Sequence, residues 1–427
     1  MPKSRKSRVN ILVFPCGSEI GLEIHRAFDG IKGVTLVGGS SVADHGRFVF
    51  QRYREGLPDV DDVSFVPELR KLISEEDIQF FFPAHDSVVL KCARHEQELR
   101  CQVIGSPFET CSITRSKRKT YQRLQGSIPT PTVYSQANAE FPVFLKPDAG
   151  QGSRGTVIAR NRRELEFYTT NDPSLLILAY LPGEEYTVDC FTDRKRELLF
   201  VGPRRRNRIL NGISVGTFNV RDGGFTEMAE RINEQLVLNG AWFFQVKRSA
   251  NGVLTLMEVA PRIGGSSGLY RAMGVNLPAL SYYNQLGLPL AIHCNQFDAE
   301  MDRAWSNRYR LKIDYKQVYI DFDDCLCING KVNPTAVKFL IQAINQGKRT
   351  CLLSRHCEGP LAARLKELRV LDLFDEVRQI RDDCSKAEFV SGDSIFIDDS
   401  FAERQDVARK RGIPVFAVDA IDALLNE

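Results

Sequence analysis

Residues 242–262 read WFFQVKRSANGVLTLMEVAPR, and this stretch carries the strongest signals for the fold and the site of the larger part of the chain. Two apolar segments, Trp242–Lys247 and Leu254–Val259, flank an Asn-Gly pair, which is the strongest short signal for a β-hairpin turn. Gln245 and Glu258 lie one on each predicted strand, so their side chains could face the same point. A carboxylate in an otherwise apolar strand is costly to bury without a partner. A bound Mg²⁺ would be such a partner for Glu258.

Upstream of this hairpin, the first hundred residues alternate apolar strands with helical segments. The predicted strands are Val9–Phe14, Val34–Gly38 and Phe80–Pro83, and the predicted helix Leu22–Phe28 follows a glycine-rich turn. This alternation predicts a parallel sheet with crossover helices. The turn over residues 17–21 lacks the GxGxxG pattern, so we interpret it as a tight strand–helix connection rather than a nucleotide site.

A second glycine-rich stretch, DAGQGSRG at residues 148–155, follows the predicted strand Phe141–Lys146. Glycines let backbone N–H groups come close to phosphates, and Lys146 can reach a phosphate as a point charge. A surface hairpin would explain the same residues if they stood alone. The other elements predicted here are a polar helix over 112–127 and strands at Thr156–Arg160, Leu175–Leu181, Glu185–Phe191 and Leu198–Val201.

Several motifs in a fixed order resemble the ATP-grasp superfamily, in its carbamoyl-phosphate-synthetase-like branch, from about residue 9 to residue 295. The motifs are Ser-Lys117 with Thr120 before the IPTP turn, FLKP around Lys146, the loop 148–155, YLPGEEYTVD around Glu185, PRRR from Pro203, GIS from Gly212, Gln245, and EVAPR from Glu258 to Arg262. The resemblance implies an α/β fold, with a Rossmann-like pre-ATP-grasp domain over residues 1–110 and an ATP-grasp domain over residues 111–312.

The resemblance also implies a role for each matching residue. ATP would be bound by Lys117, Lys146, Gly152, Ser153, Gly155, Ala179, Leu181 and Glu185, with the two lysines on phosphates, Ala179 to Leu181 at the adenine and Glu185 at the ribose. Gln245 and Glu258 would hold Mg²⁺, and Arg262 would act catalytically by stabilising the acyl phosphate or the transferring phosphate. The run Arg204–Arg206 with Arg208 matches basic family positions, which favours a substrate or phosphate contact over a solvated face.

One position departs from the family pattern. Ala260 stands where the family usually has an Asn that binds metal, and alanine cannot ligate Mg²⁺. A second metal ion would therefore need water or another side chain to complete its shell, and weak or lost ATP turnover is the alternative that this position raises.

The last third of the chain repeats one pattern three times, an apolar strand that ends in polar residues. The strands and their polar followers are Val318–Ile320 with Asp321 and Asp323, Cys351–Leu353 with Ser354, and Ile395–Ile397 with Asp398 and Asp399. Lys386 begins a predicted helix between the second and third strands. Because ligands bind at the carboxyl edge of the sheet in α/β folds, we expect these residues to gather there. Acidic loop caps without chemistry are the alternative interpretation.

These motifs resemble the haloacid dehalogenase superfamily over residues 316–427. The resemblance implies that Asp321 is a nucleophile forming an aspartyl-phosphate, that Asp323 is a general acid and base, and that Ser354 and Lys386 hold the phosphoryl oxygens. The Mg²⁺ ligands would come from Asp321, Asp323, Asp398 and Asp399. Cys325 replaces the usual Thr. The short intervals between motifs leave no room for an inserted lid, which predicts an uncapped domain over residues 313–427 whose site is open, or covered by the neighbouring domain.

Composition narrows the function classes. Of the 427 residues 26% are charged, but the net charge is only +3, which offers no global argument for nucleic-acid binding. Eleven cysteines without a secretory segment suggest a reducing cytosol, and Cys325 and Cys327 have no second pair at zinc-ligand spacing. No apolar run approaches the ~20 residues of a membrane helix. We therefore expect a cytoplasmic protein and interpret the basic residues before Val9 as a solvated tail.

Three functional hypotheses follow from the sequence. The first is a bifunctional enzyme with ATP and Mg²⁺ as cofactors: a ligase that joins a small carboxylate to an amine or another nucleophile, and a phosphatase acting on a phosphorylated compound. The second makes one half a regulatory or binding module, and Ala260 points to the ATP-grasp half. The third is a nucleic-acid-processing factor, which strong salt dependence of binding would distinguish. The sequence names neither the substrates nor the oligomeric state.

Overall fold

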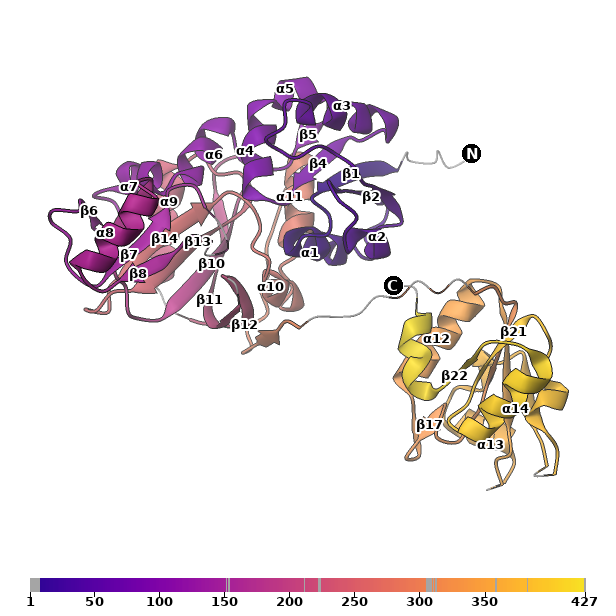
Figure 1. Ribbon diagram of the computed structural model, residues 1–427. Coiled ribbons are helices and arrows are strands. Elements are labelled where there is room, and N and C mark those ends of the chain that lie inside the picture. Colours follow the sequence, from indigo (N-terminus) through magenta and orange to yellow (C-terminus); the bar gives the residue numbers. More distant parts are fainter. Residues whose placement is uncertain are drawn as a thin grey trace. The chain divides into compact units, whose positions relative to one another are not determined.

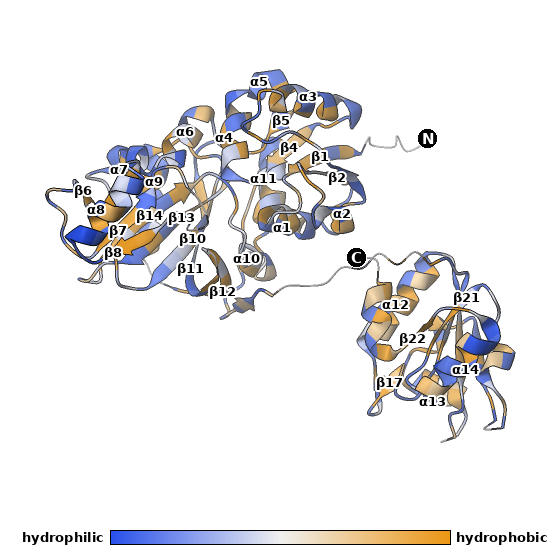
Figure 2. Ribbon diagram, in the orientation of Figure 1, coloured by the Kyte–Doolittle hydropathy of each residue, from blue (hydrophilic) through white to orange (hydrophobic). Residues whose placement is uncertain are grey.

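The computed structural model describes residues 8–425 apart from Gln151, Ser153, Asn211, Asp222, Gly223, residues 305–308, Arg310, Lys312, Glu358 and Asp382. The chain divides into two compact units, Met1–Trp305 and Ser306–Glu427 (Figure 1). The predicted division near residue 312 falls on a position outside the described residues. The strands of both units are mostly apolar, and the helices carry both polar and apolar residues (Figure 2).

The first unit begins with a parallel sheet in the order β3-β2-β1-β4-β5. Its strands are β1 (Val9–Phe14), β2 (Val34–Gly39), β3 (Arg52–Arg54), β4 (Phe80–Pro83) and β5 (Gln102–Val103). The helices along this segment are α1 (Glu19–Ala27), α2 (Gly46–Val49), α3 (Phe65–Glu75), α4 (Asp86–Arg94) and α5 (Glu96–Leu99). The alternation of strand and helix signals thus predicted the parallel pairing. Helix α1 begins three residues before the predicted start, because Ser18 caps it by accepting a hydrogen bond from the Gly21 backbone N–H.

The next segment shows one clear difference from the prediction. In place of a single helix over 112–127 there are two helices, α6 (Phe108–Arg115) and α7 (Lys117–Leu124). They separate at Ser116, whose backbone is extended and whose hydroxyl accepts a hydrogen bond from the Lys119 backbone N–H. Serine competes with the helical backbone for hydrogen bonds and so favours the cap over the helix interior.

Two antiparallel sheets complete the first unit. The smaller has the order β6-β9-β7-β8, with β6 (Val133–Tyr134), β7 (Val143–Pro147), β8 (Val157–Ala159) and β9 (Leu175–Ala179). The larger has the order β14-β13-β10-β11-β12-β15, with β10 (Glu185–Thr192), β11 (Leu198–Leu210), β12 (Ile213–Asn219), β13 (Gly240–Arg248), β14 (Leu254–Ala260) and β15 (Glu300–Asp302). The helices here are α8 (Arg162–Asn171), α9 (Gly224–Gln235), α10 (Gly268–Ala272) and α11 (Leu277–Gln285).

The hairpin predicted over residues 242–262 is present as β13 and β14, which pair antiparallel. Their register places Gln245 directly opposite Glu258. Strand β11 is longer than predicted and includes the whole arginine run, because β10 and β12 pair with it on either side. Since side chains alternate between the faces of a strand, Arg204 and Arg206 share one face of β11 and Arg205 lies on the other.

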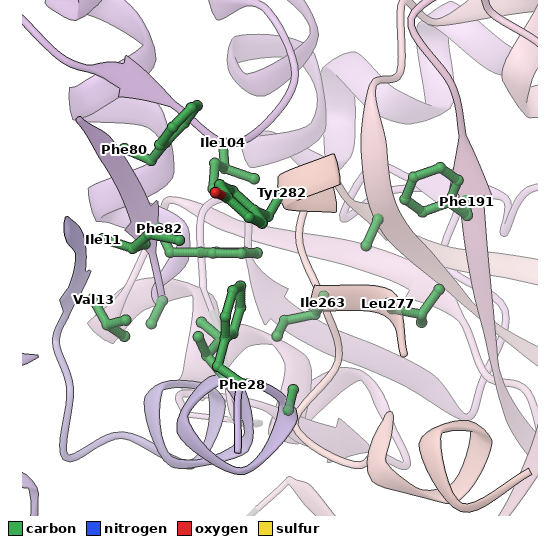
Figure 3. Close-up of a cluster of buried hydrophobic side chains, with 14 of the residues drawn as sticks. Ile11, Val13, Phe28, Phe80, Phe82, Ile104, Phe191, Ile263, Leu277 and Tyr282 are labelled. Carbon is green, nitrogen blue, oxygen red and sulfur yellow. The ribbon is translucent and has the colours of Figure 1, made fainter. Parts of the chain in front are cut away.

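One hydrophobic cluster joins the N-terminal sheet to later parts of the first unit (Figure 3). Tyr282 of α11 packs edge-on against Phe80 of β4, with ring centroids 5.3 Å apart, and also contacts Phe28. Ile263 and Leu277 belong to the same cluster. The two domains predicted at 1–110 and 111–312 therefore share a core within one compact unit.

The second unit is a parallel sheet in the order β20-β19-β16-β21-β22. Its strands are β16 (Gln317–Ile320), β19 (Arg349–Ser354), β20 (Glu376–Gln379), β21 (Ser394–Ile397) and β22 (Val415–Phe416), and a small hairpin is formed by β17 (Cys327–Ile328) and β18 (Lys331–Val332). Its helices are α12 (Pro334–Asn345), α13 (Leu361–Glu367) and α14 (Phe401–Arg411), with short 3-10 turns at Leu371–Leu373, Lys386–Phe389 and Val418–Leu424. All three predicted strands lie side by side at the centre of this sheet. None of the described helices has the length and apolar character needed to span a membrane.

Candidate functional site

A cavity of about 730 Å³ lies in the first unit at the carboxyl ends of β1 and β4. These neighbouring parallel strands lead to helices that return on opposite sides, so the strand order reverses between them. Ligands bind at such reversal points in open α/β sheets. Residues after β1, including Ser18 and Glu19, and after β4, including His85 and Asp86, line the cavity together with residues of the larger antiparallel sheet.

The two predicted phosphate-binding lysines are buried, and Lys117 lines the cavity whereas Lys146 lies outside its lining. Lys117, the first residue of α7, donates to the backbone oxygens of Asp148 and Gly150, each at 3.3 Å. Lys146 on β7 donates to the Met257 carbonyl at 3.2 Å. Burial lowers the pKa of Lys117 and lowers that of Lys146 to about 8, while the nearby Glu258 carboxylate opposes both shifts. Both ammonium groups are thus partly desolvated and have too few anionic partners, which suits them to bind an anionic ligand.

Glu258 and Gln245 both line the cavity on paired strands. Arg206 donates to Gln245 Oε1 at 2.9 Å and forms an ion pair with Glu185. Ala260 also lines the cavity and adds no ligand atom. One carboxylate and one amide oxygen fit the oxygen chemistry of Mg²⁺, but a magnesium ion there would take most of its remaining ligands from water or from a bound phosphate.

Arg262 holds a fixed position at the cavity wall. Its guanidinium donates to both oxygens of Asp86, at 2.7 and 2.6 Å, and lies over the Phe243 ring. Burial alone would raise the pKa of Asp86, but Arg262 lowers it overall, so the pair is ionised. A bidentate ion pair of this kind aims a cation at a defined point.

Other arginine–carboxylate pairs lie around the same cavity. Arg204 donates to Asp189 at 2.6 Å, and Arg303, which follows β15, donates to Glu19 at 2.7 Å. In contrast, Arg205 pairs with Glu184 at the surface and Arg208 pairs with the exposed Asp302. The arginine run therefore has two inward members at the cavity, Arg204 and Arg206, and two members at the surface.

The structure gathers some of the predicted site residues but not others. Lys117, Gly152, Gln245, Glu258 and Arg262 line the cavity. The lining does not include five predicted residues, Lys146, Gly155, Ala179, Leu181 and Glu185, although Glu185 is held by Arg206. Ser153 is outside the described residues.

Sequence reasoning missed several residues of this cavity, notably Glu19, His85, Asp86 and Arg303. A usable signal existed for the first three. Each follows an apolar strand of a predicted parallel sheet, where ligand-binding residues concentrate. Arg303 carried no such signal, because it reaches Glu19 across 284 positions of the chain.

In the second unit, polar residues meet at the carboxyl ends of β16, β19 and β21, as the spacing predicted. Lys386 lies buried between two carboxylates, 3.0 Å from Asp321 and 2.7 Å from Asp398. Burial raises the pKa of Asp321, and raises that of Asp398 to about 6 even though Lys386 opposes both shifts. For Lys386, burial lowers the pKa but the two carboxylates raise it overall, so its ammonium charge is maintained.

The four aspartates predicted as Mg²⁺ ligands do not all lie together. Ligand atoms of Asp321, Cys325 and Asp399 lie within 4.8 Å of one another. Asp398 is instead bound to Lys386 and accepts a hydrogen bond from the Ser400 backbone N–H. Asp323 is exposed and lies 3.0 Å from Nδ1 of the buried His356, a residue that the sequence did not single out. The carboxylates of Asp321 and Asp399 fit a divalent cation, with the Cys325 thiol beside them.

Comparison with known proteins agrees with the fold of the first unit. Residues 171–307 match a protein family described as ATP-grasp in the biosynthetic pathway with Ter operon. The solved structures that resemble the chain include the biotin carboxylase domain of Hydrogenobacter thermophilus 2-oxoglutarate carboxylase (16% identity, TM-score 0.57, 67% of this chain and 71% of that one). They also include N5-carboxyaminoimidazole synthetase of Staphylococcus aureus (15%, 0.58, 70% and 83%) and L-amino acid ligase of Bacillus licheniformis (19%, 0.53, 67% and 76%).

No curated protein matches the sequence. The structural matches share less than a fifth of their residues with this chain, so the likeness is one of fold. The first unit has the ATP-grasp fold.

Proposed function

We propose that the first unit is an ATP- and Mg²⁺-dependent ligase that joins a small carboxylate to an amine or another nucleophile. The observation that carries this proposal is that the desolvated Lys117 lines one cavity with Glu258 and Gln245, while the desolvated Lys146 donates to the Met257 carbonyl next to Glu258. Two of the similar structures contain ADP, one of them with magnesium, which supports the same reading of the cavity.

In the proposed reaction, a carboxylate oxygen of the acid bonds to the γ-phosphorus of ATP while the bond to ADP breaks. The nucleophile then bonds to the acyl carbon, loses its proton, and inorganic phosphate leaves. Lys117 and Lys146 neutralise phosphate charge, and Arg262, fixed by Asp86, stabilises the charge on the transferring group. Glu258 and Gln245 would hold magnesium, which would supply further charge neutralisation.

The test is ADP release by the full chain across a panel of carboxylates, with MgATP affinity measured by calorimetry. Lys146→Ala and Glu258→Gln should each abolish ADP release while circular dichroism stays unchanged. Lys119→Ala is the matched control, because Lys119 lies exposed on the first turn of α7 and should behave as wild type. Full turnover in either of the first two variants would refute the assignment.

We propose for the second unit a Mg²⁺-dependent phosphate-ester hydrolysis, on its own geometry. An Asp321 oxygen bonds to phosphorus as the ester oxygen leaves with a proton from Asp323, and water then hydrolyses the aspartyl-phosphate with Asp323 taking up the proton. Lys386, 3.0 Å from Asp321, offsets the repulsion between carboxylate and phosphate. Ser354, at the end of β19, would hold a phosphoryl oxygen.

An aryl phosphate and Mg²⁺ test this second activity. Asp321→Asn should remove hydrolysis, whereas Asp324→Asn, three residues along at an exposed position with φ of +51°, should retain it because Asn tolerates this backbone conformation. Hydrolysis that survives Asp321→Asn would exclude Asp321 as the nucleophile. ATP consumption by the first unit should be unchanged in both variants.

A second candidate function for the first unit is nucleotide binding without turnover, and Ala260 is the observation that favours it. With one carboxylate at the metal position, the site could bind MgATP yet position it poorly for transfer. Tight MgATP binding combined with no ADP release on any acid would support this function over the ligase.

A further inference from the structure

Arg204 is a buried arginine that has an unused hydrogen-bond donor. Arg204 is only 2% exposed, and its Nη1 has no hydrogen-bond partner among the residues that the structure describes. The guanidinium is held on its other side by Asp189, which is fully buried. Arg204 nevertheless lines the cavity. A buried N–H group without a partner is costly, and such groups in native proteins usually serve a ligand, water or ion.

The loop beside Arg204 adds more unused donors. Gly264, Gly265 and Ser266 line the cavity, and their backbone N–H groups donate to no described residue. The Ser267 hydroxyl is buried and likewise without a partner in the described part of the chain. Backbone N–H groups without a partner beside a cavity can donate to a bound anion.

The two glycines of this loop, Gly264 and Gly265, leave space that a side chain would fill. A Cβ on Gly264 would come within 2.9 Å of Arg204 Nη2, and one on Gly265 within 3.0 Å of Glu19 Oε2 and 3.4 Å of Arg303 Nη1. Neither glycine has positive φ, so their backbone conformation does not demand glycine. The missing side chains instead let the loop lie against Arg204 on one side and Arg303 on the other.

This region is separate from the phosphate end of the cavity. Arg206, two residues along the same face of β11, contacts Gln245 at the expected metal position. The Cα atoms of Arg204 and Arg206 lie about 6.6 Å apart, as two residues at this spacing in a strand do. An anion at Arg204 could therefore belong to the same small molecule as the carboxylate that reacts.

We propose that Arg204, Arg303 and the loop 264–266 form a second anion subsite, and that one substrate of this unit carries a second anionic group, a carboxylate or a phosphate, that is not the group activated. The identification of the bound acid as a substrate rests on the proposed ligase function, whereas binding of an anion at this subsite can be measured without it. The subsite selects short acids with two anionic groups over acids of equal length with one.

Equilibrium binding to the full chain tests the proposal with three matched probes: butyrate, succinate and 3-phosphonopropionate. Wild type should bind at least one of the two dianions about tenfold or more tightly than butyrate, and the better of the two identifies the second group as carboxylate or phosphate. Arg204→Lys keeps a cation for Asp189 but loses the planar fork, and should erase most of this preference. Arg205→Lys, at the next position but on the surface, should leave it intact.

Gly265→Ala and Arg303→Gln provide independent variants should Arg204→Lys fail to fold. Gly265→Ala should weaken dianion binding by filling the space beside Glu19 and Arg303, with MgATP affinity unchanged as the sign of an intact fold. Equal binding of all three probes to wild type, or a preference that persists in folded Arg204→Lys, Gly265→Ala and Arg303→Gln, overturns the subsite. If wild type does not bind MgATP at all, the ligase proposal is refuted, but a measured preference for dianions over butyrate still supports the anion subsite.

Discussion

The Lys146 ammonium shows how burial tunes a single residue for its ligand. Burial lowers its pKa from the ordinary 10.5 to about 8, so the free protein carries the cation below pH 8 and loses it above. A bound phosphate favours the charged form and raises this pKa in the complex. MgATP affinity should therefore be constant near pH 7 and fall above pH 8, by up to about tenfold per pH unit.

Calorimetric titration of MgATP at pH 7, 8 and 9 measures this dependence, and Lys146→Arg is the matched control because its guanidinium stays charged throughout. The lowered pKa of Lys146 also makes the stability of the folded protein depend on pH. The unfolded chain keeps the Lys146 proton up to about pH 10.5 while the folded chain releases it near pH 8, so the free energy of unfolding should rise with pH across that window. Affinity that is flat to pH 9 in wild type would contradict the assigned position of Lys146.

Residue-level prediction succeeded where chemistry and strand pairing coincide. Gln245 and Glu258 were brought together by a hairpin that a local turn signal defines, so their meeting followed from the sequence. Asp86 and Arg262 are 176 positions apart, and the pair depends on how α4 packs near the end of β14. His356 similarly reaches Asp323 from the next strand of its sheet. Such partners follow from tertiary packing, which periodicity does not specify.

The cap of α7 links a helix boundary to the nucleotide site. Ser116 accepts from the Lys119 backbone N–H and donates to Asp148 Oδ2 at 2.7 Å, which ties α7 to the start of the glycine loop. Ser116→Ala should cost about 1 kcal/mol of stability, as typical N-cap losses do, and should also weaken MgATP binding because Lys117 follows directly. Ser400→Ala removes the cap of α14 in the second unit and should cost a similar amount without any change in MgATP affinity.

Helix α1 depends on close packing at Gly21. A Cβ there would lie 2.4 Å from the Cys16 carbonyl oxygen and 2.6 Å from that of Pro15, both fixed backbone atoms. Alanine would gain about 1 kcal/mol of helix propensity, but overpacking typically costs about 1–3 kcal/mol and a backbone clash lies at the upper end. Gly21→Ala should therefore be destabilising in urea unfolding. Gly105→Ala, where a Cβ meets nothing within 4 Å, should be neutral, and equal stability of the two variants would contradict the packing.

At the scale of the whole molecule, strand and helix alternation predicted the N-terminal parallel sheet, and motif order predicted the ATP-grasp fold. The helix boundaries around Ser116 and the length of β11 were not predictable, because a single cap and two flanking strands decide them. The shared core of the first unit was also missed. Tyr282 contacts Phe80 and Phe28, both more than 200 residues earlier in the chain, and no local pattern marks such contacts.

The two units should unfold as separate cooperative transitions in the full chain, because every described hydrophobic cluster lies within one unit or the other. Phe339 is fully buried in the second unit and Phe244 in the first. Truncation of a buried Phe to Ala typically costs about 3–5 kcal/mol. That loss corresponds to a fall in Tm of roughly 10–20 °C for the smaller second unit and roughly 5–8 °C for the larger first unit, because the entropy of unfolding grows with size. Calorimetry of Phe339→Ala should show one transition lowered and the other unmoved, and Phe244→Ala should show the reverse.

MgATP should raise only the transition that Phe244→Ala lowers, since the proposed nucleotide site lies wholly in the first unit. A single transition that both substitutions lower together would show instead that the units unfold as one.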